Sequence, residues 1–565
     1  MKKIIPVIVA IVLIFIVVSV AFGAQIMEKY SYSKEHADLE EYFEITGTDD
    51  VPIILQDERI EEHAKVWDNV CYFDFDTVHK YFNDRFYEDK IEKLLIYTTP
   101  YTIIRTEIGS SVFQSSVDEY DDIGYIISRY EGDILYVAAD FVKQYANFSY
   151  ELFTEPYHMQ IYTLWDERTV ADINKDTQVR YQGGIKSDIL TDVSAGDTVI
   201  ILEEMETWTK VKTKDSYIGY VENKRLTDKR SEQPVPVTDY VEPEYVSISK
   251  DYKINLAWHA IYDLGGNGTL TGLLANTKGV NTISPTWFVL SGTEGNFTSL
   301  ASKEYVNTAH DMGLEVWALI SNISETESID MYTLLSQTST RTKLIENLIN
   351  TALEYDLDGL NIDFENISTD AGEGFIEFIR ELSIQCRANG IILSVDNYVP
   401  MGYNNHYHRK EQGLVADYVI IMGYDEHHGN SEEAGSVASI DYVEKGIAKT
   451  AEEVPAGKII NAVPFYTRIW ETKGSTLSSQ AVGMGMAAEY VENHHIEIRW
   501  DETTCQNYGE YQSGDSFIQV WLEDDESIQV KLSIMDKYNI AGVASWRLGL
   551  EKASVWDVIE EYLNK

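Results

Sequence analysis

The sequence predicts a multidomain protein that ends in a (β/α)8 TIM barrel, after an N-terminal apolar helix, a small α+β domain and a small β-barrel domain. Its 565 residues correspond to three or four domains at about 150 residues each. Hydrophobic residues make up 44% of the chain and aromatic residues 12%, which is enough for large packed cores. Between residues 251 and 565, strand-like runs alternate with amphipathic helix-like runs, and this alternation predicts the barrel.

The net charge excludes several functions. Asp and Glu total 93 and Lys and Arg total 45, which gives a formal net charge of −48. Nucleic-acid binding needs basic residues that neutralise phosphates, so no nucleic-acid partner is expected. The same charge argues against electrostatic binding to an anionic membrane surface. Only residues 210–230, with seven basic and three acidic residues, are clearly positive after the N-terminus. This stretch is either a solvated face or an electrostatic contact for an anionic polymer.

Residues 1–25 are predicted to be a transmembrane anchor or a signal peptide. Lys2 and Lys3 precede an uncharged apolar run of 21 residues, from Ile4 to Ala24, and about 20 residues span a bilayer. We favour an uncleaved anchor, with the lysines in the cytoplasm and the other domains outside the cell. Ala21-Phe22-Gly23 is also compatible with a cleavage site, which leaves a secreted protein as the alternative.

Two small domains are expected next. Residues 26–50 are polar and acidic and are interpreted as a stalk. Residues 51–168 contain an internal repeat, because CYFDFDTVHKYF at 71–82 aligns with LYVAADFVKQYA at 135–146. Each copy is interpreted as a helix followed by a strand, which predicts an α+β domain. The layout resembles the N-terminal domain of copper amine oxidases, which implies a spacer or wall-contact module without copper.

Residues 169–228 are predicted to form a small β-barrel, because short alternating runs such as 198–202 and 208–211 are separated by Gly and Asp turns. The order of AGD, TV, WTKV and GYV resembles the bacterial Src-homology-3-like domain, which implies binding to peptidoglycan. Residues 229–250 contain three prolines among charged residues and are interpreted as a semi-rigid linker.

The predicted barrel has eight strands. Several of them are apolar on both faces, as parallel strands beneath helices should be. The candidate strands are residues 254–260, 280–290, 316–322, 360–365, 391–398, 418–424, 459–466 and 541–548.

The fourth strand carries the strongest chemical signal, the sequence DGLNIDFE at 358–365. Alternation places Asn361, Asp363 and Glu365 on one face of the strand. In a barrel this face points inward, and active sites lie at the carboxyl ends of the strands. Two carboxylates close together perturb each other's affinity for a proton, which suits a general acid. A solvated strand face is the alternative.

The motif DGLNIDFE resembles the acidic motif of glycoside hydrolase family 18, the chitinases and their relatives. SPTWF at 284–288, VWALISN at 316–322, MGYDEH at 422–427 and ASWRLGLE at 544–551 stand where that family's barrel strands end. The set is most similar to the branch that acts on peptidoglycan, including spore-cortex N-acetylglucosaminidases.

The resemblance implies a role for each matched residue. Glu365 would be the general acid, while Asp363 would orient the substrate's 2-acetamido group, which acts as the nucleophile in a retaining reaction. Tyr424 would hydrogen-bond the acetamido carbonyl. The substrate-binding residues would be Trp546, as a stacking floor, with Asp425, Met422, Asn361 and Trp287.

Two positions need separate treatment. Asp358 has the opposite alternation from Asp363 and is expected to be structural. Asn361 stands where the family has an Asp. It can still hydrogen-bond Asp363, but it cannot share a proton with it, which puts the family's proton relay in doubt.

No metal or cofactor is expected. Cys71, Cys386 and Cys505 are far apart, and the pairs His427-His428 and His494-His495 lack a third ligand at suitable spacing. The predicted partner is peptidoglycan or a chitin-like N-acetylglucosamine polymer. The alternatives are a chitinase, an endo-β-N-acetylglucosaminidase, and a carbohydrate-binding barrel without catalysis.

Overall fold

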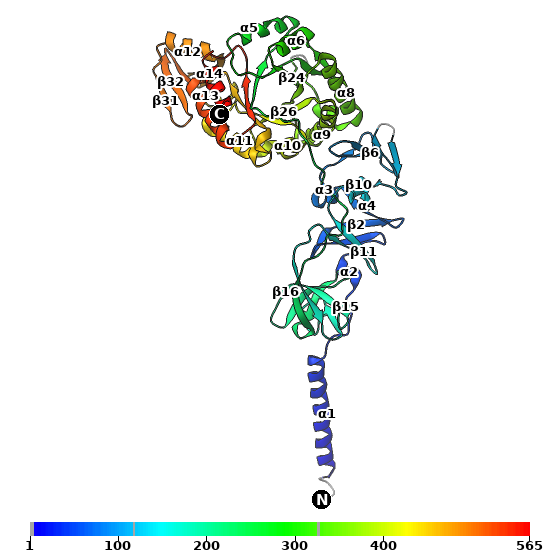
Figure 1. Ribbon diagram of the computed structural model, residues 1–565. Coiled ribbons are helices and arrows are strands. Elements are labelled where there is room, and N and C mark those ends of the chain that lie inside the picture. Colours follow the sequence, from blue (N-terminus) through cyan, green and yellow to red (C-terminus); the bar gives the residue numbers. More distant parts are fainter. Residues whose placement is uncertain (1–4, 117–118, 325–327) are drawn as a thin grey trace. The chain divides into compact units, whose positions relative to one another are not determined.

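The computed structural model describes residues 5–116, 119–324 and 328–565, which form two compact units (Figure 1). One unit holds most of residues 5–242. The other holds residues 243–565 together with 87–105 and part of 114–119. The boundary differs from the predicted domain 51–168, because part of that domain's sequence packs with the C-terminal barrel.

The N-terminal helix α1 (Ile5–Tyr30) is long and apolar enough to cross a membrane, with a mean hydropathy of 3.2 over its most apolar 18 residues. It continues five residues beyond the predicted end at residue 25. Lys2 and Lys3, on which the predicted orientation depends, lie outside the described residues.

Residues 31–50 are folded, which corrects the prediction of a stalk. Helix α2 (Leu39–Phe43) begins at Asp38, whose side chain accepts hydrogen bonds from two backbone N–H groups. Phe43 is 1% exposed and packs against Ile54, Leu190 and Tyr217. The stalk was predicted from the acidic composition, which does not reveal that α2 is a short helix with one buried aromatic ring, Phe43.

The α+β region contains a seven-stranded sheet in the order β11-β12-β1-β2-β3-β10-β9. Both copies of the repeat begin with a strand, which corrects the predicted helix-then-strand order. These strands, β3 and β10, are antiparallel neighbours and lead into helices α3 and α4. Cys71, Tyr72 and Phe73 are all buried, which fits a strand whose successive side chains point to opposite, covered faces of the sheet. The bounds are β1 (Asp50–Leu55), β2 (Glu58–Trp67), β3 (Val70–Asp74), α3 (Phe75–Tyr81), β9 (Ser128–Glu131), β10 (Ile134–Ala138), α4 (Ala139–Val142), β11 (Ser149–Thr154) and β12 (Tyr157–Tyr162).

The small β-barrel domain is a seven-stranded sheet in the order β15-β14-β18-β17-β16-β13-β19. Six apolar side chains, among them Val179, Val199 and Val211, form its core. The bounds are β13 (Arg168–Ile173), β14 (Thr177–Arg180), β15 (Ile189–Val193), β16 (Thr198–Glu204), β17 (Trp208–Lys212), β18 (Ile218–Glu222) and β19 (Leu226–Glu232).

Ion pairs neutralise much of the basic stretch 210–230. Lys212 is 1% exposed and lies 2.7 Å from Asp57. Lys224 pairs with Glu222 at 2.8 Å, and Arg230 pairs with Asp172 at 3.0 Å. These pairs favour the solvated-face interpretation over a contact for an anionic polymer.

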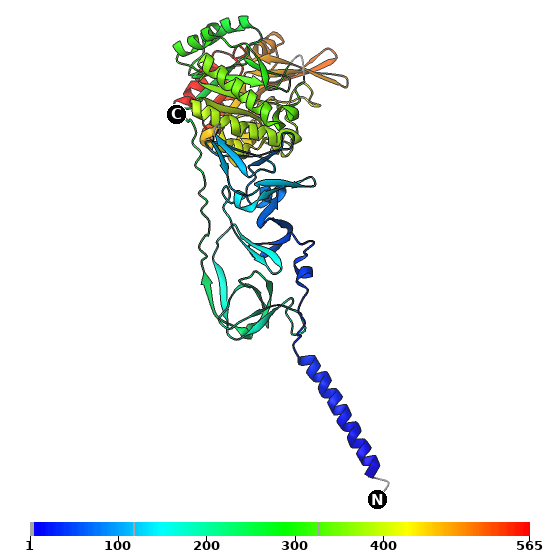
Figure 2. The same ribbon diagram turned by 90° about the vertical axis from the view of Figure 1, so that its right-hand side faces the viewer.

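The C-terminal unit contains a closed barrel of eight parallel strands (Figure 1, Figure 2). Pairing of β20 with β34 and of β21 with β24 completes the ring. The barrel strands are β20 (Ile254–His259), β21 (Thr282–Pro285), β24 (Glu315–Ser321), β25 (Gly359–Asp363), β26 (Ile392–Tyr398), β27 (Tyr418–Met422), β28 (Ile459–Pro464) and β34 (Gly542–Trp546), while β22 (Phe288–Ser291) and β23 (Asn296–Ser299) form a hairpin beside β24.

The barrel has an outer and an inner core. Residues such as Leu360 and Ile362 pack outward against the helices, whereas Leu256, Leu319 and Ile420 pack inside. The helices are α5 (Leu270–Leu274), α6 (Lys303–Asp311), α7 (Met331–Ser336), α8 (Thr338–Tyr355), α9 (Gly372–Asn389), α10 (Arg409–Val415), α11 (Ile440–Ala451), α13 (Asp525–Tyr538) and α14 (Val555–Leu563).

An insertion that the sequence analysis did not predict lies between β28 and α13. It is a five-stranded antiparallel sheet in the order β30-β29-β33-β32-β31, with one helix. Its elements are β29 (Tyr466–Lys473), β30 (Thr476–Gly483), α12 (Met484–Asn493), β31 (Ile498–Asp501), β32 (Gln506–Ser513) and β33 (Ser516–Leu522).

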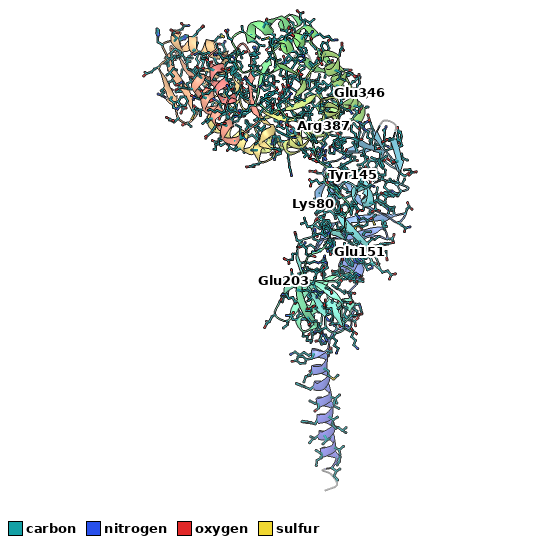
Figure 3. All side chains as sticks on the ribbon, viewed as in Figure 1. Lys80, Tyr145, Glu151, Glu203, Glu346 and Arg387 are labelled. Atoms are coloured by element: carbon teal, nitrogen blue, oxygen red, sulfur yellow. The ribbon has the colours of Figure 1, made fainter. Side chains whose placement is uncertain are left out.

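Residues 87–105 contact the barrel helices. They come from a sheet with the order β4-β5-β6-β7-β8. Asp89, which is fully buried, accepts hydrogen bonds from the backbone N–H (2.7 Å) and hydroxyl (2.6 Å) of Thr338 at the start of α8. Gln337, the residue before α8, provides no side-chain cap of its own. Arg387 on α9 (Figure 3) donates to the carbonyl of Pro100 at 3.3 Å. The bounds are β4 (Phe86–Asp89), β5 (Leu94–Thr98), β6 (Ile103–Glu107), β7 (Val112–Ser116) and β8 (Glu119–Asp122).

Candidate active site

The carboxyl end of β25 places the predicted acidic residues inside the barrel. Leu360 and Ile362 are fully buried in the outer core, so the alternate residues, Asn361 and Asp363, point inward. Glu365 follows two residues after the strand ends. The arrangement agrees with the predicted alternation and puts two carboxyl groups at the barrel mouth.

Asn361 lies at the centre of a buried hydrogen-bond network. Its side-chain oxygen accepts from Trp258 Nε1 at 2.9 Å and from Ser284 Oγ at 3.3 Å. Its nitrogen donates to Ser394 Oγ at 3.1 Å and to Asp396 Oδ1 at 2.8 Å. Donors on one side and acceptors on the other determine the orientation of the amide. The Asn361 amide therefore bonds Asp396 rather than Asp363, which corrects the expected contact.

Asp363 has a buried carboxyl oxygen. Its Oδ1 has no hydrogen-bond partner among the described residues. Burial raises the pKa of Asp363 well above its usual value, and the negative charges of Asp396 and Glu365 raise it further. A carboxyl group in this position favours the protonated form, or a ligand that supplies a hydrogen-bond donor.

Glu365 is held by contacts on both its backbone and its side chain. Its backbone N–H donates to Asn322 Oδ1 at 2.8 Å, and Asn322 Nδ2 donates to the Glu365 carbonyl at 2.8 Å. Its Oε2 accepts from the Tyr398 hydroxyl at 2.7 Å. Burial and the charge of Glu365 raise the pKa of Tyr398, so this hydroxyl remains a donor. The carboxyl group of Glu365 is thus fixed in place before any substrate binds.

Replacing Tyr398 with Phe tests this contact. We expect Tyr398→Phe to lower kcat on a glycan substrate by about 10-fold to 100-fold, because a hydrogen bond to a charged group contributes about 1.5–3 kcal/mol. KM should change little. Initial-rate kinetics measures both constants, and an unchanged kcat would show that Asn322 alone suffices to position Glu365.

Tyr424 and Asp425 lie just beyond the end of β27. Burial raises the pKa of Tyr424 well above its usual value, and nearby Tyr466 and the three acidic groups of the site raise it further. The Tyr424 hydroxyl therefore stays protonated near Asp363, Asp396 and Glu365. Asp425 accepts a 2.6 Å hydrogen bond from Tyr466 on β29, so the inserted sheet supports this edge of the site. Met422 is half-buried at the end of β27.

The two predicted tryptophans have different surroundings. Trp546 ends β34, is half-buried and lies 5.8 Å from Trp258 between ring centroids. Trp287 is 1% exposed, packs in the outer core against Tyr305 and donates to Asn267 Oδ1 at 2.8 Å. A fully covered ring offers no face to a sugar, so the structure contradicts the expected substrate contact of Trp287.

Asp358 is placed as the sequence analysis expected. Its Oδ2 accepts from the Val316 backbone N–H at 2.8 Å and lies 2.8 Å from His310 Nε2. These contacts tie β25 to its neighbour β24 and to α6. Asp358 is thus a structural residue at the start of the strand.

A cavity of about 620 Å³ opens beside Glu365. Its wall includes Asn322, Ile323, Asp330, Tyr332, Glu365 and Asn366. Tyr332 is 45% exposed, so part of its ring is free to contact a ligand. The volume is typical of a small-molecule or oligosaccharide subsite.

Two site residues were missed by the sequence analysis, Asp396 and Tyr398. The signal was present, because Ser394, Asp396 and Tyr398 alternate along a strand whose other residues, apart from Asn397, are apolar, as the polar residues of β25 do. Across the described ranges, no group of three or more His, Cys, Asp or Glu side chains could hold a metal ion.

Comparisons with known proteins identify two families in this chain. Residues 217–551 match the glycosyl hydrolases family 18, and residues 175–227 match the bacterial SH3 domain. The predicted likeness of residues 51–168 to copper amine oxidases stays a prediction.

Two similar curated proteins come from Bacillus species. A protein of Bacillus subtilis named as a sporulation-specific glycosylase is 29% identical over 230 residues, which are 39% of this chain and 54% of that protein. The cortical fragment-lytic enzyme of Bacillus anthracis is 25% identical over 256 residues, 43% of this chain and 59% of the enzyme. This chain thus spans little more than half the length of either relative.

Among solved structures, the chitinase from Chromobacterium violaceum covers 55% of this chain and 99% of its own, with 23% identity and a TM-score of 0.50. At this identity the likeness shows the fold. The family match covers more than half of the sequence, and the acidic strand of the motif stands at the barrel mouth. The chain therefore belongs to family 18 of the glycosyl hydrolases.

Proposed function

We propose that the protein hydrolyses β-1,4 bonds next to N-acetylglucosamine in peptidoglycan, outside the cytoplasmic membrane. The observation that carries this function is the placement of Asp363 and Glu365 together at the barrel mouth, with the Glu365 carboxyl held by Tyr398. The Bacillus relatives, named for sporulation and for cortex fragments, favour peptidoglycan over chitin. The bacterial SH3 domain favours the same polymer.

In the proposed reaction, Glu365 donates its proton to the leaving glycosidic oxygen. The acetamido oxygen of the substrate attacks the anomeric carbon and forms an oxazolinium ion. Water then opens that ion with retention of configuration and gives its proton to the Glu365 carboxylate, which restores the acid. Asp363 accepts a hydrogen bond from the acetamido N–H and stabilises the positive charge that develops. The protonated Tyr424 hydroxyl donates to the acetamido carbonyl. Trp546 provides the floor beneath the sugar ring, and Asp425 and Met422 line its edge.

Helix α1 is proposed to anchor the protein in the membrane, because its apolar length fits a bilayer. A secreted form is the alternative. Among other functions, a chitinase or endo-β-N-acetylglucosaminidase would use the same residues. A carbohydrate-binding barrel without catalysis is disfavoured, because both carboxyl groups of the motif are present at the carboxyl end of β25.

Mass spectrometry of digested peptidoglycan identifies the bond that is cleaved. We expect N-acetylglucosamine at the new reducing ends, because the acetamido group must belong to the sugar whose anomeric carbon reacts. Chitin oligomers digested in parallel test the chitinase alternative. Turnover of chitin without turnover of peptidoglycan would contradict the proposed substrate, and binding of either polymer without turnover would favour the carbohydrate-binding alternative.

A thiazoline mimic of the oxazolinium ion tests substrate assistance. We expect competitive inhibition with an inhibition constant at least about 100-fold below KM, because analogues of high-energy species bind about 10²-fold to 10⁸-fold more tightly than substrates. Steady-state inhibition kinetics on a soluble glycan measures this constant. A mechanism with a protein nucleophile would leave the compound a weak inhibitor.

A further inference from the structure

The neighbouring strand β26 carries a carboxyl group beside Asp363. In the register of the parallel pair, Asn361 lies opposite Ser394 and Ile362 opposite Val395. One residue further along, Asp363 and Asp396 are therefore lateral neighbours, on strands about 4.8 Å apart. Both residues have the inward alternation of Asn361 and Ser394. The two side chains thus project into the barrel from neighbouring positions of one layer, near enough for the charge of Asp396 to act on Asp363.

The surroundings of Asp396 contain mostly acidic and neutral polar groups. Asp396 is 2% exposed, and its Oδ1 accepts from Asn361 Nδ2 at 2.8 Å. Glu365 lies near enough for its charge to act on both Asp396 and Asp363. Tyr424, just after β27, lies near enough for the charges of all three carboxyl groups to act on it, and from β26 itself Tyr398 bonds Glu365. Two adjacent buried carboxyl groups in such surroundings are not both ionised.

We propose that Asp396 is a positioning residue that shares one proton with Asp363, taking the place of the carboxyl group that Asn361 lacks. This role rests on the proposed hydrolysis, in which Asp363 must carry negative charge beside the oxazolinium ion. When Asp363 accepts the acetamido N–H, its proton passes to Asp396. When the oxazolinium ion is opened, the proton returns, so the pair neither gains nor loses a proton over one turnover.

The direction of titration agrees with this geometry. Burial and the charge of Glu365 raise the pKa of Asp396 to about 8, although the hydrogen bond from Asn361 opposes the rise. The pKa of Asp363 is also raised, by burial and by the charges of Asp396 and Glu365. The pair titrates as a unit and retains a proton at neutral pH.

The test moves the second carboxyl group from position 396 on β26 to position 361 on β25 by substitution. Asp396→Asn keeps an oxygen that accepts from Asn361, so the network of hydrogen bonds survives while the shared proton is lost. In the full chain, we expect kcat to fall at least about 10-fold while KM changes less than about threefold. The double variant Asn361→Asp/Asp396→Asn moves the carboxyl group to β25 and should recover kcat to within about threefold of wild type. Recovery separates proton sharing from a structural role.

Asp417→Asn is the matched control. Asp417 is another buried Asp, 4% exposed, but it accepts from the backbone of Leu393 and Ile248, away from the site. We expect it to leave kcat unchanged in the folded enzyme. If Asp396→Asn retained wild-type kcat, or if the folded double variant were no more active than Asp396→Asn, the proposed role of Asp396 would be overturned.

A stability profile gives a readout that needs no turnover. Because the folded pKa of Asp396 is raised, its contribution to stability is present at low pH and is lost as pH rises towards about 8. The melting temperature of Asp396→Asn should therefore rise relative to that of wild type between about pH 4 and pH 8, the interval between the usual pKa of an Asp and the raised one. Parallel profiles would overturn the role of Asp396. Absence of turnover in wild type on every N-acetylglucosamine polymer would instead contradict the proposed function, which keeps the two failures distinct.

Discussion

Replacing Glu365 with Gln should lower kcat on purified peptidoglycan by about 10²-fold to 10⁴-fold, the usual contribution of a general acid. Gln retains an oxygen that can accept from Tyr398, and the two backbone contacts with Asn322 do not involve the Glu365 side chain. The variant should therefore fold and bind as wild type does, with a nearly unchanged KM. Release of reducing ends measures the rate.

Glu346→Gln is the control for this experiment. Glu346 is an exposed Glu on α8 of the same barrel (Figure 3), so its replacement should leave kcat unaltered. Equal rates for Glu365→Gln and wild type would exclude Glu365 as the acid. Equal rates would also contradict the proposed roles of Asp363 and Tyr424, which depend on Glu365 being the acid.

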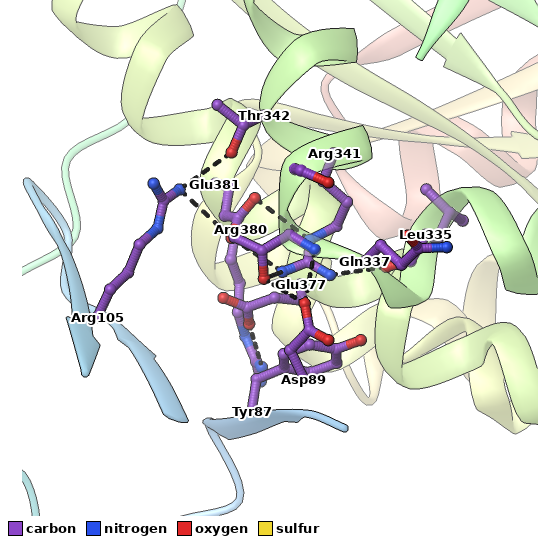
Figure 4. Close-up of polar contacts among 12 residues, drawn as sticks. Tyr87, Asp89, Arg105, Leu335, Gln337, Arg341, Thr342, Glu377, Arg380 and Glu381 are labelled. Carbon is purple, nitrogen blue, oxygen red and sulfur yellow. Dashed lines mark hydrogen bonds and ion pairs between the residues drawn. The ribbon is translucent and has the colours of Figure 1, made fainter. Parts of the chain in front are cut away.

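Replacing Glu381 with Ala should destabilise the C-terminal unit by about 3–5 kcal/mol, the typical cost of leaving a buried charge unpaired. Glu381 and Arg341 are both fully buried and lie 3.2 Å apart (Figure 4). Without Glu381, the Arg341 guanidinium keeps the Leu335 carbonyl at 2.8 Å, the Thr338 hydroxyl and the face of the Tyr87 ring. None of these carries a negative charge, and Glu377, whose charge also acts on Arg341, already pairs with Arg380. Denaturant unfolding of the barrel transition measures the loss.

Two comparisons make the result specific to burial. Glu444→Ala removes one partner of the exposed Lys537–Glu444 pair, 2.6 Å apart, and should cost less than about 1 kcal/mol. The double variant Arg341→Met/Glu381→Leu replaces the buried pair with apolar side chains and should recover most of the stability. A loss for Glu381→Ala no larger than that for Glu444→Ala would show that water reaches the pair.

The same cluster joins residues 87–105 to the barrel. Arg105 lies 3.9 Å from Glu381 and donates to the Thr342 hydroxyl at 3.3 Å. Arg380, also on α9, lies 3.2 Å from Glu377 and 2.8 Å from Glu411. Three acidic and three basic side chains thus balance across α8, α9, α10 and β6. Arg105 supplies the third positive charge, so residues 87–105 are part of the folded barrel unit.

Most of the barrel could be predicted because its signals are local. A strand buried on both faces between amphipathic helices leaves a periodic pattern in the sequence, and all eight predicted strands overlap the eight observed ones. The faces of β25 followed from alternation alone. The inserted sheet of residues 466–522 was missed because strands such as β30 and β32, although eight residues long, are mostly polar and half-exposed and lack the apolar run of a barrel strand.

The site residues divide in the same way. Asp363, Glu365, Tyr424 and Trp546 stand at strand ends, where alternation or a matched motif identifies them one by one. The proposed role of Asp396 depends on the register between β25 and β26, which places it beside Asp363. Tryptophan is a residue type that often stacks on sugars, yet the packing of the outer core covers Trp287 completely.

By itself, the sequence determined the order of the domains, the eight strands and the inward face of the acidic strand, because periodicity is a property of neighbouring residues. Only the tertiary structure decided which carboxyl group neighbours Asp363, which of the two tryptophans stays partly exposed, and which N-terminal residues join the barrel. These depend on contacts between residues distant in sequence, such as Asn361 with Asp396 and Thr338 with Asp89. Strand register and the burial of charged groups select such contacts, and both depend on how separate segments of the chain pair and pack.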